Sequence, residues 1–317
     1  GMVMSGGARH LVQSCDVHDV DGGGIYIRGG DPNTLTPAEH AVVNSDICRV
    51  GLRQRVDAPG VDIGGVGNRI ANCRIRDLPH SAIIFAGNDH RMERNEISHA
   101  CMEINDCGVI YGTLNILHRG TVIRENFVHH IGNRWGPRQG AVYTDEGHGG
   151  VRVVSNIFYR VGYEHPHTGV LLGNGHNSSL YSNNIFVDCK APVGGHCWPP
   201  EEWRTMLRPG GRYSGFRKLP AQARPLYISR YPELAGAWEN DEWLPPASEV
   251  TGNLGIHSGR FELRGVTFKD NLVTSEDPGF ADMEAMDFTL NDLSWIRARL
   301  KNFEPIPFAE IGLQRDQ

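Results

Sequence analysis

The sequence predicts an all-β chain that coils as a right-handed, single-stranded parallel β-helix. Two units recur along the chain, one centred on Asn and one made of short β-branched and aromatic runs. The third observation is glycine, at 39 of 317 residues or about 12%, against an average of roughly 7%. So much glycine indicates many tight turns, as an architecture of short strands requires.

The first unit is an Asn followed two positions later by an apolar residue. It is clearest in Asn95-Glu-Ile97, Asn126-Phe-Val128, Asn156-Ile-Phe158 and Asn184-Ile-Phe186. The same register holds earlier in the chain, where the small residues Cys15, Ser45 and Cys73 take the place of Asn. The step between units varies from 22 to 31 residues while the unit stays constant. Loops of unequal length between constant strands produce such a pattern.

The second unit recurs within each step and is typical of a short strand. Its clearest instances are Gly24–Ile27, Val61–Ile63, Ala82–Phe85, Val109–Tyr111, Ala141–Tyr143 and Gly169–Leu172. Across residues 8 to 195 no window sustains apolar residues at helical spacing. A period of about 20–30 residues is too short for a helical crossover, so the strands are expected to stack as a solenoid.

The recurring Asn has a physical explanation within a solenoid. An inward amide at a corner can bond its own turn and the equivalent amide one coil away, which satisfies donors and acceptors that burial would otherwise orphan. We therefore predict an Asn ladder, with Cys15, Ser45 and Cys73 in the same position of the earlier coils. The alternative is that Asn only marks turns.

Three segments divide the chain, within what we expect to be one structural domain. Residues 8–195 form the coils, and residues 196–249 interrupt the repeat with a stretch rich in proline, tryptophan and arginine. We expect this stretch to be an ordered insertion with one or two helical turns, packed across the solenoid. Residues 250–317 supply a last coil and a C-terminal cap with a closing helix near Leu293–Lys301.

The N-terminal end shows no cap of its own, because the first coil begins by residue 10. Solenoid ends require covering. We expect missing residues or another subunit to cover this end, so that the protein is an oligomer or the chain is the C-terminal part of a longer protein.

Composition excludes several classes of function. The net charge is −6 and no basic stripe could follow phosphates, so no nucleic-acid partner is expected. No run approaches the ~18 apolar residues of a membrane span, and we identify no signal peptide. Seven irregularly spaced cysteines form no Cys-x-x-Cys pair, and the 15 histidines show no metal-binding spacing. We expect no metal site and no cofactor.

Acidic residues near strand ends suggest where chemistry could occur. Asp106 precedes one predicted strand and Asp145 follows the strand of the next coil. Equivalent positions on successive coils lie ~4.8 Å apart, so the two carboxylates could face one groove. Glycosidic cleavage needs such a pair, one to protonate the leaving oxygen and one to activate water or attack the sugar. Because the two registers differ, they could instead be turn residues at separate corners.

The sequence also resembles a family. Asn105–Tyr111, Gly120–Asn126, Val142–Glu146 and Gly150–Val161 are similar to segments of bacterial right-handed β-helix glycoside hydrolases, a group with fucosidases and xylanases that act on plant cell-wall polysaccharides. The resemblance covers roughly residues 95 to 317. It implies a pectate-lyase-like solenoid, a secreted or periplasmic location, and a catalytic role for Asp106 and Asp145. Glu146 stands where a second Asp is usual in the family, and His130 where an Asp is expected.

Three functions remain open from the sequence. The first is a glycoside hydrolase that uses Asp106 and Asp145 on a polysaccharide or oligosaccharide. The second is a uronate-acting lyase or epimerase, in which Arg124 or a cation neutralises the carboxylate and Tyr143 or a histidine takes the proton. The third is a non-catalytic carbohydrate-binding solenoid. The expected substrate contacts are Tyr111, Arg124, His129, His130, Tyr143 and Glu146.

Overall fold

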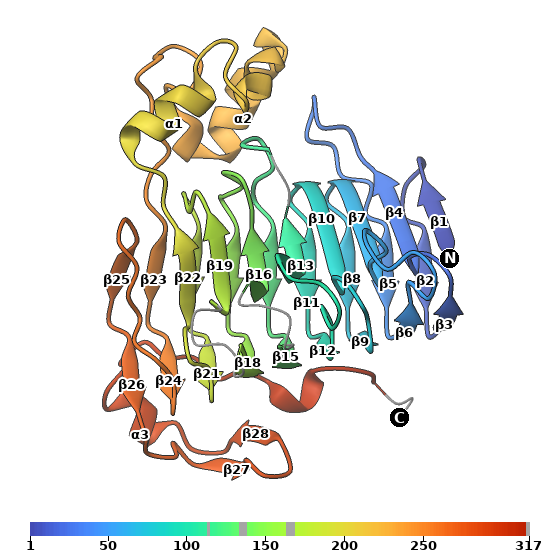
Figure 1. Cartoon of the computed structure of the whole chain (residues 1–317), viewed down its shortest axis with the longest axis vertical. Helices are drawn as coiled ribbons and strands as arrows, with labels where there is room; N and C mark the ends of the chain where they lie inside the picture. Colours follow the sequence, from blue (N-terminus) through green and yellow to red (C-terminus); the bar gives the residue numbers. More distant parts are fainter. Residues whose placement is uncertain (113–114, 133–137, 163–168, 315–317) are drawn as a thin grey trace.

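The structure, a computed structural model, describes residues 1–112, 115–132, 138–162 and 169–314. Three parallel sheets stack their strands coil upon coil into a right-handed β-helix, which confirms the predicted fold (Figure 1). We call the sheets A, B and C, in the order in which each coil visits them. Apolar side chains from all three sheets fill the interior, and two phenylalanines of successive coils, Phe158 and Phe186, stack there with ring centroids 5.1 Å apart.

Sheet A carries the longer strands and consists of β1 (Met2–Ser5), β4 (Ile25–Gly29), β7 (Val61–Val66), β10 (Ile83–Asn88), β13 (Cys107–Gly112), β16 (Gln139–Thr144), β19 (Leu171–Asn174) and β22 (Val193–His196). Sheet B consists of β2 (Leu11–Gln13), β5 (Ala41–Val43), β8 (Arg69–Ala71), β11 (Arg91–Glu93), β14 (Val122–Arg124), β17 (Arg152–Val154), β20 (Leu180–Ser182), β23 (Glu249–Thr251) and β25 (Thr267–Lys269). Sheet C consists of β3 (Asp16–Val20), β6 (Asp46–Val50), β9 (Arg74–Arg76), β12 (Glu96–Ser98), β15 (Phe127–Ile131), β18 (Ile157–Val161), β21 (Ile185–Val187), β24 (Leu254–Ile256) and β26 (Leu272–Thr274).

The predicted Asn ladder is present at the corner between sheets B and C. The amide oxygen of Asn156 accepts both the backbone N–H and the side-chain N–H of Asn126, at 3.0 and 2.9 Å. Asn184 accepts the same pair of bonds from Asn156, and the pattern repeats in the neighbouring coils. The full ladder runs through Asn95, Asn126, Asn156, Asn184, Asn253 and Asn271. Cys73 and Cys15 lie in the same row, as expected, where their backbone N–H groups bond to Asn95 and Ser45.

A second, shorter ladder of histidine and asparagine forms the corner between sheets A and B. The backbone N–H of each residue donates to the side chain one coil on, from His10 to His40, His40 to Asn68 and Asn68 to His90. His90 is fully buried, and its Nε2 bonds to the Ala86 carbonyl at 3.1 Å. Burial lowers the pKa of His90 from its usual 6.5 to about 4, so the ring is neutral at pH 7.

The insertion is more helical than expected and lies beyond the carboxyl ends of the sheet A strands (Figure 1). It contains α1 (Pro200–Leu207) and α2 (Arg224–Arg230), with short 3₁₀ turns at Ser214–Lys218, Ala221–Ala223 and Pro232–Leu234. Its apolar side chains pack on Ile116 and Leu117 of the solenoid.

Arg119 anchors the insertion to the coils. Its side chain is fully buried and bonds to the Ile116 carbonyl, to Asn177 Oδ1 and, at 3.5 Å, to Glu233 of the insertion. Burial lowers the pKa of Arg119 to about 10, which still leaves the guanidinium charged at pH 7. A buried charge with these partners ties the insertion to one place on the solenoid.

The C-terminal segment differs from the expected end cap. Its hairpin of β27 (Phe280–Asp282) and β28 (Asp287–Leu290) and its helix α3 (Ser294–Arg297) cover the outer face of sheet C instead, where Phe288 packs against Phe127 (Figure 1). The tail then runs back along the coils, and Gly312 donates to the Arg94 carbonyl. At the C-terminal end of the coils, the connection before β25 packs against the core, where Phe261 lies edge-on against Phe186.

At the N-terminal end, β1 is the edge strand of sheet A, so the solenoid begins ahead of the expected residue 8. Val3 and Leu11 are exposed there, at 70% and 56%. Oligomerisation through this end stays a prediction. Within the part of the chain that the structure describes, no helix is long and apolar enough to cross a membrane.

The ladder predicts a large cost for removing one buried amide. Asn156→Ala leaves both Asn126 donors and the carbonyls of Ile123 and Val154 without the amide that they bond. We expect the free energy of unfolding in urea, followed by circular dichroism, to fall by about 3 kcal/mol. Asn302→Ala, on the exposed surface, is the control and should change it by less than about 0.5 kcal/mol. Equal effects of the two substitutions would contradict a structural role for the ladder.

Stability should also fall in mild acid. The pKa values of buried His90 and His176 are lowered by burial to about 4, below the usual 6.5. Between these values the unfolded chain binds more protons than the folded one, so stability is full above pH 6.5 and declines as pH drops toward 4. We expect a loss of about 2 kcal/mol per histidine from pH 6.5 to 5, measured by urea unfolding. His90→Asn should reduce this pH dependence, and a slope unchanged in the variant would show that other groups cause it.

Candidate active site

The two predicted acids lie on neighbouring strands of sheet A, at opposite ends. Asp106 immediately precedes β13, while Asp145 immediately follows β16, and these strands pair directly. The different registers left open that the two carboxylates point to separate corners. Two neighbouring tyrosines bond to the two carboxylates and bring them to the same face.

Tyr111 and Tyr143 are register partners on β13 and β16, and their rings lie edge to face with centroids 5.3 Å apart. The Tyr111 hydroxyl donates to Asp145 Oδ2 at 2.6 Å, and the Tyr143 hydroxyl donates to Asp106 Oδ1 at 3.2 Å. Burial, then the nearby carboxylates, raises the pKa of both tyrosines well above the usual 10. Both phenols therefore keep their protons and act as hydrogen-bond donors at neutral pH.

Both carboxylates therefore bond to one pair of neighbouring phenols, although the two acids lie at opposite ends of their strands. Burial has the largest effect on the pKa of Tyr143, and both Asp145 and Asp106 lie close enough to raise it further. The side chains of the two acids thus converge over the tyrosine pair, an arrangement in which two carboxyl groups can flank one glycosidic bond.

Asp145 is held from its other side by a chain of polar contacts that the sequence did not reveal. Asn174 Nδ2 donates to Asp145 Oδ1 at 3.1 Å, and the indole N–H of Trp198 donates to Asn174 Oδ1 at 2.8 Å. The backbone N–H of Glu146 donates to Asp145 Oδ1 as well. Aligning the strand units would have placed Asn174 beside Asp145, because Thr144 and Gly173 are register partners. The contact with Trp198 could not be predicted in this way, because Trp198 belongs to the insertion and not to a repeated strand unit.

Two arginines lie at the edges of the pair. Arg212 of the insertion contacts Glu146 at 2.8 Å, so Glu146 is near Asp145 but already has a cationic partner. Arg138 contacts Asp106 at 3.4 Å, and both of these side chains are more than half exposed. The exposed contact is weak in water and leaves the Asp106 carboxylate accessible to a ligand.

A hollow of about 350 Å³ opens beside the pair on the outer face of sheet A. Tyr143 and Arg138 form one side, and Asn174 and His196 the other. Gly173 and Gly195 also line it. At Gly195, with φ of +88°, a Cβ would lie 1.9 Å from the Gly173 carbonyl oxygen, so only glycine fits there. The hollow has the size and polar lining of a site for one or two sugar units.

The structure places the other three predicted substrate contacts away from this face. Arg124 lies on β14 of sheet B, where it bonds to Glu93. His129 and His130 lie on β15 of sheet C, bonded to each other at 2.8 Å. The chain turns one corner between sheet A and Arg124 and two corners between sheet A and the histidines, so nearness to Asp106 in sequence does not bring them near in space.

Both histidines pack against other rings of the solenoid. His129 stacks on Phe127 with ring centroids 4.3 Å apart, beneath the C-terminal segment. His130 stacks on His99, and burial together with its neighbouring histidines lowers its pKa to about 4. Among the described residues, no group of three or more histidine, cysteine, aspartate or glutamate side chains is arranged to hold a metal ion.

Comparison with solved structures supports the fold. A structure titled as XylC in complex with xylose aligns with 97% of this chain and 46% of its own length, with a TM-score of 0.50 and 12% identity. A structure titled glycoside hydrolase aligns with 62% of this chain and 34% of its own length, with a TM-score of 0.43 and 18% identity. The chain thus spans half or less of these proteins. Comparison with curated proteins gave no match.

A family comparison identifies the N-terminal part of the sequence. The family described as right handed beta helix region matches residues 1–197, which contain all of sheet A and the two aspartates. Stacked parallel strands and the continuous ladder of buried amides account for the match. The chain belongs to the right-handed beta-helix family.

Proposed function

We propose that the protein is a carbohydrate-active enzyme, a glycoside hydrolase that cleaves a polysaccharide or oligosaccharide with Asp106 and Asp145. The observation that carries the proposal is that both carboxylates bond to the paired tyrosines, Asp145 to Tyr111 and Asp106 to Tyr143, beside an open hollow on sheet A. The distant likeness to a xylose-bound structure agrees with a sugar ligand but by itself supports only the fold.

In this mechanism one carboxylic acid donates its proton to the glycosidic oxygen as the bond to the anomeric carbon breaks. The other carboxylate removes a proton from water, or attacks the anomeric carbon directly. Tyr111 and Tyr143 hold the two carboxylates in place, since their raised pKa values keep both hydroxyls protonated. Asn174 fixes Asp145 from the opposite side.

The uronate lyase or epimerase alternative has less support. Its proposed carboxylate partner, Arg124, lies on sheet B beside Glu93. Its proposed base, Tyr143, keeps its proton because burial and two carboxylates raise its pKa. A non-catalytic solenoid would need no pair of converging acids, although the same hollow could bind sugar.

Removing either carboxylate should abolish turnover. We expect Asp106→Asn and Asp145→Asn each to lower kcat/KM on soluble plant polysaccharides at least 100-fold, because each loses a proton-transfer or nucleophilic step. Reducing-sugar release measures hydrolysis, and ultraviolet absorbance of an unsaturated product would identify a lyase instead. Asp188→Asn is a matched control, since Asp188 also follows a strand but lies on sheet C. Full activity in both site variants would remove these residues from the mechanism.

Loss of the Asn174 amide should impair catalysis without preventing folding. Asn174→Ala removes the bond that orients Asp145, and we expect kcat to fall about 10-fold. Trp198→Phe keeps most of the ring packing but deletes the N–H that holds Asn174, so kcat should fall in the same direction by a smaller factor. Steady-state kinetics and thermal unfolding together separate this positioning role from a general loss of stability. Unchanged kcat in Asn174→Ala would contradict it.

A further inference from the structure

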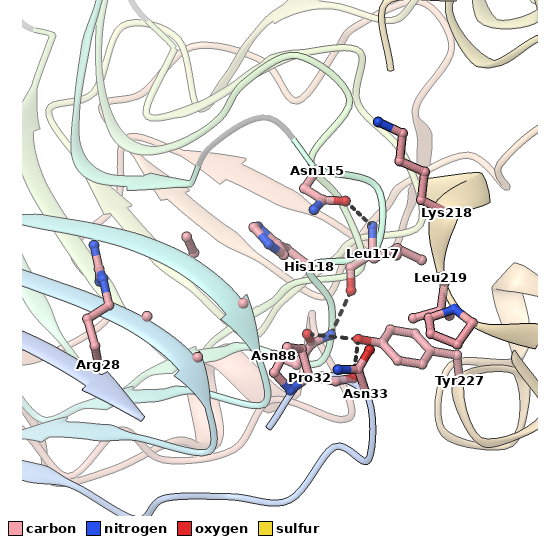
Figure 2. A pocket seen from close by; sticks show the side chains of 15 residues that line it. Arg28, Pro32, Asn33, Asn88, Asn115, Leu117, His118, Lys218, Leu219 and Tyr227 are labelled. Atoms are coloured by element: carbon pink, nitrogen blue, oxygen red, sulfur yellow. Dashed lines mark hydrogen bonds between the residues drawn. The ribbon is translucent and has the colours of Figure 1, made fainter. Parts of the chain in front are cut away.

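A second hollow, of about 410 Å³, lies on the outer face of sheet A toward the N-terminal coils (Figure 2). Its floor is formed by β7 and β10, where Gly64, Gly65 and Gly87 carry no side chains. Its walls come from three distant parts of the chain, namely residues 32–33, residues 115–118 and residues 218–220 with Tyr227 of the insertion. In Figure 2, Arg28 lies on one side of this hollow, with Lys218 and Tyr227 on the side opposite.

Strand register connects this hollow with the aspartate pair. Arg28, Gly64 and Ala86 occupy one row across β4, β7 and β10. One residue earlier on each strand, Phe85 pairs with Gly112 and Gly112 pairs with Thr144. Ala86 and Asp145 are the residues that follow Phe85 and Thr144, so Asp145 lies in the same row as Ala86. Four strand steps of about 4.8 Å separate Arg28 from Asp145, roughly 19 Å along the solenoid. A chain of several sugar units fits this span.

The chemistry of the two hollows differs. No carboxylate belongs to the lining of the Arg28 hollow, whereas Arg28 and Lys218 both do, together with the amides of Asn33, Asn88 and Asn115. The nearest acids beside Tyr227 are already engaged, because Asp89 contacts Arg230 at 3.2 Å and Asp31 caps its own turn. The lining therefore offers positive charge and hydrogen-bond donors, which suit an anionic group.

Arg28 is held in a conformation that leaves donors available. Its Nη1 contacts Asp62 at 2.6 Å, and the guanidinium lies flat over Gly64, where a Cβ would come within 2.5 Å of Nη1. Among the described residues, the structure shows no partner for its Nε and Nη2, and the side chain is 45% exposed. Asp62 thus orients the guanidinium while part of its donor set faces the hollow.

From these observations we infer that the Arg28 hollow binds an anionic sugar unit, one with a carboxylate or a sulfate ester, about four strands from the site of cleavage. This inference rests on the proposed function and adds its substrate class: a polymer that carries acidic units and runs along sheet A. Arg28 and Lys218 are specificity residues in this arrangement and have no part in bond cleavage.

Calorimetric binding to the catalytically inactive Asp145→Asn protein tests the inference. The probes are an oligogalacturonate and a glucuronate-branched xylo-oligosaccharide, each compared with its carboxyl-reduced form, and a sulfated xylo-oligosaccharide. We expect at least one acidic probe to bind 10-fold or more tightly than its neutral counterpart, and the carboxylate and sulfate probes separate the two kinds of anion. Arg28→Gln and, independently, Lys218→Gln should each remove most of this difference.

Arg49→Gln is the matched control, because Arg49 is similarly exposed and similarly paired with an aspartate but lies on β6 of sheet C. Equal affinity for acidic and neutral probes, or selectivity that survives both substitutions, overturns the inference. If neutral polymers are nevertheless hydrolysed, the proposed function stands alone. Arg28-dependent binding of an acidic probe in a wild-type protein that shows no turnover supports the site and refutes the hydrolase.

Discussion

The in-register stacking of one coil on the next is the constraint on which the rest of this structure depends. Buried Asn side chains enforce it, since each amide must bond the coil before it and the coil after it to avoid unsatisfied polar groups. A slip of one residue would break this ladder and turn core side chains outward. Register is therefore fixed along the whole solenoid, including sheet A, where it aligns Arg28, Asp145, Asn174 and His196 in one outward row.

The insertion adds side chains beside that row and helps to form the second hollow. Trp198 holds Asn174, which holds Asp145, while Lys218 and Tyr227 form the far wall of the second hollow. Buried Arg119 connects the insertion to the coils through Ile116, Asn177 and Glu233. One segment thus supports the candidate catalytic acid and shapes the proposed recognition site.

Charge is distributed unevenly along the same face. The aspartate pair concentrates negative charge between two protonated tyrosines, and the Arg28 hollow offers positive charge roughly 19 Å away. Gly64 and Ala86, which follow Arg28 in the same row, carry no charge. Such a face favours a long ligand whose anionic sugar unit lies away from the bond to be cleaved. It disfavours an anionic sugar unit next to Asp106 and Asp145.

Much of the fold followed from the sequence alone, because strand stacking depends on local pattern. The spacing of Asn95, Asn126, Asn156 and Asn184 predicted both the solenoid and the ladder. The same spacing predicted that Asp106 and Asp145 belong to adjacent coils. Their roles as acids remain a proposal. The C-terminal segment was placed at the wrong surface, since an apolar hairpin can cover a sheet face as readily as a solenoid end.

What the tertiary structure decided was which side chains share a face. Sequence proximity suggested His129, His130 and Arg124 as neighbours of the acids, but each coil turns corners within a few residues and sends them to sheets C and B. Conversely, Asn174 reaches Asp145 and Arg212 reaches Glu146 from far along the chain, and Trp198 holds Asn174. A repeat in the sequence determines how coils stack, whereas the direction of each side chain and the fold of the insertion depend on packing that no local pattern encodes.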